Sequence, residues 1–298
     1  MVLLTLLTLV LTAPDAGDYR RNVSRVDFKH CERWDAGTPI EWRMSVDGNP
    51  ETPGDTEDVA IRASFATWSL ALAECSSLTL REGPRSPSRH IGWKGSALEL
   101  DKNENLVLFR QRLCSQPGLI SPNDPCWDDE DCGNKHDCWQ HDPQVIAWTL
   151  TTYDSLGRIH DADVEFNTGS FIFTTVDSPP CVPPAYAVTC IAWDVQNVMT
   201  HEIGHMFGLG HVATNGSTMQ ASQPVGELRK RVLDEGTKSF VCRTYAAGQA
   251  SSDCVVEPVG PLGDVAPKGC GCGSAPGGLL VLLVLLLLLR RSIRPSAC

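Results

Sequence analysis

Apolar residues first alternate with polar ones in a stretch that predicts a strand. In residues 39–46 the apolar side chains occupy every second position, as expected of a half-buried strand: Ile40, Trp42, Met44 and Val46. Shorter strands are predicted around residues 78–80 and 106–109. A longer pair, 145–153 and 161–167, is joined by a segment with a turn at Gly157.

Three helices are predicted from apolar residues that recur at intervals of three and four. The first covers residues 55–75, where one apolar stripe is formed by Ile61, Phe65, Trp68 and Leu72. Its first turn is acidic, which favours the start of a helix. The second helix begins near Trp193 and the third covers residues 234–245. Together with the strands, they predict an α+β fold.

The stretch HEIGHMFGLGH, which begins at His201, carries the candidate chemistry. On a helix, His201 and His205 project from the same face, so two imidazoles can meet one zinc ion. Glu202, one residue along, is rotated from His201 by about 100° and is suited to contact a water molecule rather than the metal. Gly208 can adopt a positive φ and end the helix. The chain can then turn back so that His211 becomes the third zinc ligand.

Three protein ligands leave a fourth zinc position for water, which is the arrangement of a catalytic rather than a structural zinc. In this interpretation Glu202 is the general base that takes a proton from that water and later protonates the leaving amine. Met219 follows His211 by eight residues, the distance at which metzincins place the methionine turn beneath the zinc.

These motifs resemble the metzincin metallopeptidases, and more narrowly the matrixins. FATWS, GRIHDADVEFN, DVQNVMTHEIGHMFGLGH and the last predicted helix are each similar to matrixin segments, over residues 38–247 in total. The resemblance implies the α+β metzincin (zincin-like) fold, a twisted mixed β-sheet with an active-site helix, a methionine turn and a C-terminal helix. It also implies a zinc-dependent endopeptidase that acts on protein or peptide substrates.

The resemblance extends to a substrate strand and to further metals. If residues 161–167 form the edge of the cleft, then Val164, Glu165 and Phe166 pair with an extended substrate. Asp161 is a candidate calcium ligand. A structural zinc is not expected, because Ile159 stands where its histidine would be. No cysteine-switch motif precedes the domain, so latency through a propeptide thiol is unsupported.

Ten of the thirteen cysteines lie between Cys31 and Cys254, and this even number predicts disulfides formed in an oxidising compartment. Four of them belong to a cysteine-rich insertion, residues 112–143, which is predicted to be a disulfide-stapled loop. The acidic run 128–131 within it has two interpretations, a calcium chelate or a solvated loop, and the second is favoured. His136 and His141 are expected to be loop histidines without a metal.

Both ends of the chain indicate export. Residues 1–16 have the apolar run of a signal peptide, although no basic residue precedes it, and residues 17–37 read as a linker. After a second linker, 248–269, residues 270–298 resemble a MYXO-CTERM tag, with a cysteine motif, an apolar run and an arginine cluster. This resemblance implies sorting machinery and retention at the cell surface. A short membrane anchor is the alternative.

The net charge of −11 makes nucleic acid an unfavourable partner, because phosphate binding needs a basic surface. Two alternatives to an endopeptidase stay open at this point. One is a surface-displayed binding or adhesion module with a non-catalytic zinc. The other is a zinc hydrolase of non-peptide amides, which would use the same residues.

Overall fold

A five-stranded mixed sheet organises the part of the chain that the computed structural model describes, residues 18–26, 28–37, 39–93 and 103–254. The strands run in the order β3 (Leu80–Glu82), β2 (Ile40–Met44), β4 (Asn105–Arg110), β6 (Ile159–Asn167) and β5 (Ala147–Tyr153). The first four are parallel to their neighbours, and β5 is antiparallel to β6. The predicted α+β class is therefore confirmed, and β5 forms one edge of the sheet.

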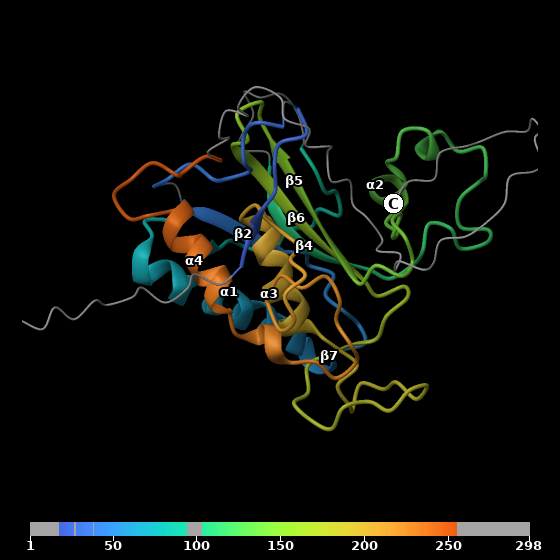
Figure 1. The fold of residues 1–298 in the computed structure, drawn as a ribbon. Helices are drawn as coiled ribbons and strands as arrows, with labels where there is room; N and C mark the ends of the chain where they lie inside the picture. Colours follow the sequence, from blue (N-terminus) through green and yellow to red (C-terminus); the bar gives the residue numbers. More distant parts are fainter. Residues whose placement is uncertain (1–17, 27, 38, 94–102, 255–298) are drawn as a thin grey trace, which may run out of the picture. The chain divides into compact units, whose positions relative to one another are not determined.

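Three helices pack together beside this sheet (Figure 1): α1 (Thr56–Cys75), α3 (Val195–Met206) and α4 (Glu235–Thr244). All three lie within two residues of the ranges expected from the apolar spacing. Helix α1 contacts both α3 and α4, and α3 also contacts β5. The sheet edge at β5 therefore lies beside the helix that carries the histidine motif.

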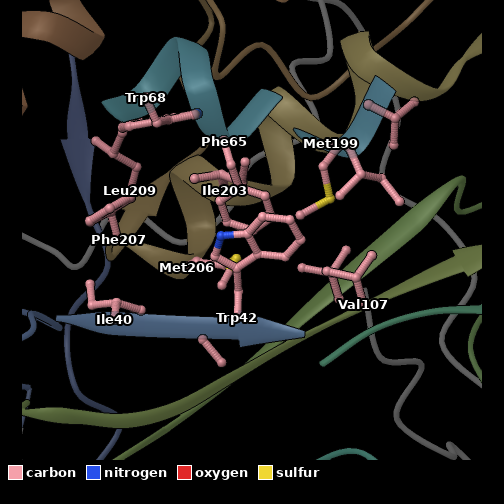
Figure 2. Close-up of a cluster of buried hydrophobic side chains, with 14 of the residues drawn as sticks. Ile40, Trp42, Phe65, Trp68, Val107, Met199, Ile203, Met206, Phe207 and Leu209 are labelled. Carbon is pink, nitrogen blue, oxygen red and sulfur yellow. The ribbon is translucent and has the colours of Figure 1, made fainter. Parts of the chain in front are cut away.

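The main core fills the space between the sheet and the helices. Figure 2 shows Trp42 of β2 directed at Phe65 of α1, and the two rings are stacked with centroids 3.8 Å apart. Trp68, also on α1, donates its indole N–H to the Thr200 carbonyl of α3 at 2.9 Å. The predicted stripe of α1 is buried, and its contacts hold α3 in place.

Shorter elements connect these layers. They are the strands β1 (Arg20–Arg21), β7 (Phe173–Thr174), β8 (Trp193–Asp194) and β9 (Leu209–Gly210), the helix α2 (Cys132–His136), and the 3-10 turns η1 (Pro53–Asp55), η3 (Pro125–Trp127) and η4 (Arg229–Arg231). Helix α2 and η3 belong to the cysteine-rich insertion. The four cysteines of the insertion and Ile120 form a small buried cluster of their own.

All ten cysteines between Cys31 and Cys254 are paired, which confirms the disulfide prediction. The pairs are Cys31–Cys254, Cys75–Cys242, Cys114–Cys138, Cys126–Cys132 and Cys181–Cys190. Two of them staple the insertion, as expected of a segment with few aliphatic side chains.

The described residues of the two predicted linkers are part of the fold, so the linker interpretation is wrong for them. In the first, β1 pairs with β9, and the Asn22 N–H donates to the Gly208 carbonyl at 2.8 Å. In the second, Asp253 accepts the Cys31 N–H at 2.8 Å. Apolar spacing does not predict these contacts, because they are made by backbone groups and by a side-chain carboxylate.

The signal peptide 1–16 and the tag 270–298 lie outside the described residues. Within the described part of the chain, no helix has both the length and the apolar character needed to cross a bilayer.

Candidate active site

Helix α3 is anchored at its first turn before it presents the motif. The Asp194 carboxylate accepts the Asn197 N–H at 2.7 Å and so caps the helix. Asp194 is fully buried, and the guanidinium of Arg231 pairs with it at 2.6 Å. The ion pair holds the Asp194 carboxylate in place, and this carboxylate in turn holds the first turn of α3 through the cap.

The side chains of His201, His205 and His211 converge on one point. The Nε2 atom of His211 lies 3.2 Å from that of His201 and 3.1 Å from that of His205. Zinc–nitrogen bonds of about 2.0–2.1 Å at tetrahedral angles separate ligand nitrogens by about 3.3–3.4 Å. The three residues therefore fit a zinc ion.

Backbone carbonyls fix which nitrogen of each helical histidine faces this point. His201 Nδ1 donates to the Thr218 carbonyl at 2.6 Å, and His205 Nδ1 donates to the Leu209 carbonyl at 2.7 Å. With Nδ1 protonated, Nε2 carries the lone pair that a metal needs. Burial also lowers the pKa of His201 well below its usual range and that of His205 to about 4. Both imidazoles are neutral at pH 7.

Gly208 makes the turn that brings His211 back to the helix. Its φ is +89°, and a side-chain Cβ at this position would overlap the Glu32 carbonyl. The positive φ agrees with the expectation from the sequence. The close approach of Glu32 has no signal in the sequence, because residue 32 lies far from Gly208 along the chain.

Glu202 lies on α3 between the two helical histidines and is 5% exposed. Its Oε2 accepts a hydrogen bond of 2.6 Å from the hydroxyl of Thr149, on β5. Burial raises the pKa of Glu202, and the Thr149 hydrogen bond acts in the opposite direction. The sequence does not indicate Thr149 as a partner of Glu202, since a single threonine 53 residues away carries no local signal.

Met219 is buried and packs against Gly204 of α3. A Cβ on Gly204 would overlap the Met219 sulfur, so the glycine is needed for this contact. The neighbouring Thr218 donates its N–H to Asp234 Oδ2 at 2.7 Å, and Asp234 also caps α4. Asp234 thus supports Thr218, whose carbonyl orients His201. This support was also missed from the sequence.

Comparison with known families decides the class of the domain. The family model named Matrixin (Peptidase_M10) matches residues 95–242, a range that includes β4, β6, β5, α3 and the three histidines. The chain carries a matrixin domain. Matrixins are zinc metalloendopeptidases, and the histidine triad is the zinc site of the family. No curated protein matches the chain.

The matrixin domain has a cleft of about 790 Å³ that contains the site. One wall is the edge strand β5 with the residues before it, and the floor carries the motif of α3. Asn22 and Glu32 from the N-terminal segment close one side. Ala221, Gln223 and Lys230 also line the cleft.

The prediction that Val164, Glu165 and Phe166 border the cleft is wrong. They lie on β6, which is paired with β4 on one side and β5 on the other. All three are at most 1% exposed. Glu165 pairs instead with the buried Arg110 and with His141. The alternating pattern identified a strand, but strand order depends on long-range pairing that the pattern does not contain.

The other groups of possible metal ligands in the described residues are less suited to bind a metal than the histidine triad. Besides the triad, one cluster in the described residues has suitable atoms, formed by Asp124, Cys126 and His136. Cys126 is in a disulfide, so it offers no thiolate. Asp161 is buried, as is Asp163, which accepts backbone N–H groups from Gly92 and Leu106. The role of Asp161 as a calcium ligand stays a prediction.

Proposed function

We propose that this chain is an exported zinc endopeptidase in which His201, His205 and His211 hold the zinc and Glu202 is the general base. The observation that carries this proposal is the position of Glu202. Its carboxylate lines the same cleft as the three converging imidazoles, between α3 and the sheet edge β5. When bound, zinc supplies a Lewis acid that lowers the pKa of a water molecule to about 7.

The hydrogen bond from Thr149 defines the proton path that we propose through Glu202. Because Oε2 accepts the threonine hydroxyl, Oε1 is the oxygen left to take a proton from the attacking water. Glu202 would then deliver this proton to the departing amine. Met219 would support the site from below through its contact with Gly204.

We propose that β5, rather than β6, is the strand that binds the substrate backbone. The side of β5 that faces away from β6 has no partner strand in the described sheet. An extended peptide can add to such an edge through main-chain hydrogen bonds. Thr149 would then link the two halves of the site, because its backbone belongs to the edge and its hydroxyl contacts Glu202.

Export and surface retention are also part of the proposal. Five disulfides support an oxidising compartment. The signal-peptide and tag assignments, and the sorting machinery that the tag implies, rest on the sequence alone. Cell fractionation of the full chain with and without residues 270–298 tests them: loss of surface retention in the truncated chain is the expected result.

Titration of the zinc-loaded enzyme with calcium, followed by thermal unfolding, tests the calcium prediction at Asp161.

The decisive experiment on the site replaces Glu202 by alanine and by glutamine in the full chain. We expect stoichiometric zinc in both variants and cleavage of casein or a peptide library reduced by at least about 100-fold. Glu235→Gln, on the exposed start of α4, is the matched control and should keep wild-type activity. Unchanged hydrolysis in Glu202→Ala would exclude Glu202 as the base. Hydrolysis of non-peptide amides, but of no peptide, would favour the amide hydrolase.

A further inference from the structure

Lys230 is a buried cation in the wall of the cleft that the proposed chemistry does not use. It is 3% exposed and lies on η4. Its backbone N–H donates to Asn197 Oδ1 at 2.6 Å, which attaches it to the first turn of α3. Both Lys230 and Val198, the residue that follows Asn197, line the cleft.

The ammonium group of Lys230 has carbonyl partners but no carboxylate partner in the described structure. It donates to the carbonyls of Gln220 at 2.5 Å and Ser222 at 3.2 Å. The nearby Glu227 pairs with Arg229 at 2.7 Å instead. An ammonium has three N–H donors, so one is left for a ligand. A buried charge without a counter-ion is costly, and a ligand that brings the opposite charge removes that cost.

The position of Lys230 relative to the site indicates which part of a substrate it would meet. Val198 and His201 are three residues apart on α3, on the same face and separated by about 4.5 Å along the helix axis. Lys230 and Val198 border the cleft, and Ala221 and Gln223 border the same cleft. A side chain bound there belongs to a residue next to or near the bond that is cleaved.

We propose that this part of the cleft, bordered by Val198, Ala221, Gln223 and Lys230, binds an acidic side chain of the substrate. Lys230 is then a specificity-determining residue, and the enzyme prefers aspartate or glutamate at one position close to the scissile bond. This inference rests on the proposed peptidase function and names its substrate class.

Two features of the surroundings agree with an acidic ligand. Burial lowers the pKa of Lys230, while the charges of Glu227 and Glu202 raise it. A substrate carboxylate would add to the second effect and stabilise the ammonium form. Lys230 also offsets the repulsion that Glu202 would exert on such a carboxylate, since both residues line one cleft.

The rival explanation is structural: Lys230 could serve only to hold the loop 220–222 through its two carbonyl contacts. Lys230→Gln separates the two roles, because glutamine can still donate to the carbonyls but has no charge. Lys230→Met removes both the charge and the donors. Lys238→Gln, on α4, removes a lysine charge away from the cleft and is the control.

The test begins with a peptide library cleaved by the zinc-loaded full chain, with cleavage sites read by mass spectrometry. The position with the strongest acidic preference is then placed in two peptides that differ only by Glu or Gln. We expect the Glu peptide to have at least about tenfold higher kcat/KM with the wild type and with Lys238→Gln. The ratio should fall to about one in both Lys230 variants. A ratio within one enzyme sample is unaffected by partial unfolding.

Each outcome bears on a different claim. Cleavage of the library without any acidic preference overturns the role of Lys230 and leaves the peptidase proposal standing. An acidic preference that persists in Lys230→Gln and Lys230→Met also overturns it. If no peptide is cleaved while zinc is bound, the proposed function fails and this inference fails with it.

Discussion

Thr149 Oγ1 lies 2.6 Å from Glu202 Oε2, and this contact joins the edge strand β5 to the helix α3. The two residues are 53 positions apart in the chain. The hydroxyl holds one carboxylate oxygen and so restricts the rotation of the Glu202 side chain, which lines the cleft. Thr149 is therefore a positioning residue for Glu202.

Replacing Thr149 by valine keeps the shape of the side chain and removes the hydroxyl. We expect kcat to fall by about tenfold, because Glu202 loses the contact that orients it, while KM and zinc content stay nearly unchanged. Steady-state kinetics and metal analysis measure this. Thr149→Ser retains the hydroxyl and should recover most of kcat. A serine variant as slow as the valine variant would show that the methyl group, not the hydroxyl, is what matters.

Gly204→Ala adds one methyl group where α3 meets the Met219 sulfur. Overpacking of this kind costs about 1–3 kcal/mol, so the free energy of unfolding of the zinc-loaded enzyme should fall by that amount. Urea unfolding followed by fluorescence measures it. The double variant Gly204→Ala/Met219→Ala should lose less than the sum of the single variants, because each change relieves the other. Additive losses would mean that the two positions do not touch.

The Cys31–Cys254 disulfide ties the N-terminal segment to the end of the described chain. Replacing both cysteines by serine should lower the free energy of unfolding by about 3–5 kcal/mol. The Cys126–Cys132 pair closes a much shorter loop, with a sequence separation of 6 against 223. Its removal should cost about 2 kcal/mol. Equal losses from the two double variants, measured by denaturant unfolding, would contradict this order.

Asp154, in the turn between β5 and β6, makes stability depend on acid. Burial alone would raise its pKa, but hydrogen bonds from the Arg158 guanidinium and from the N–H groups of Arg158 and Leu156 lower it to about 2. The depressed pKa stabilises the fold above about pH 4 and is lost as the pH falls from about 4 through 2. Asp154→Asn should therefore cost on the order of 1–2 kcal/mol at pH 7 and little near pH 2. Paired urea titrations at several pH values measure the difference, and a pH-independent difference would refute it.

The helices could be predicted because each has its signal within a few turns. Ile61, Phe65, Trp68 and Leu72 form one stripe and are all buried against α3 or the sheet. The positions of β2 and β4 were also predicted, β2 from apolar residues at every second position and β4 from a short continuous apolar run. Successive residues of β4 belong to two different hydrophobic clusters. Val107 packs in the main core with the helices, and Leu106 packs with Ile91 in a separate cluster.

The order of strands was not predictable in the same way. The run DADVEFN has acidic residues at alternate positions, which is typical of a strand with one solvated face. In the structure all three carboxylates are buried, and Glu165 is paired with Arg110, 55 residues away. The charge of a side chain does not indicate which distant residue of opposite charge will pair with it.

The sequence by itself determined the zinc ligands as candidates, the helix that carries them and the glycine that turns the chain back. The histidines and the glycine lie within eleven consecutive residues, where helical geometry sets the spacing of His201 and His205 and the turn at Gly208 returns the chain to them. Only the tertiary structure decided that β5 is the edge beside Glu202, that Thr149 orients this carboxylate, and that Lys230 lines the cleft. Each of these depends on contacts between segments far apart in the chain, and those contacts arise from the packing of the whole domain rather than from any local pattern.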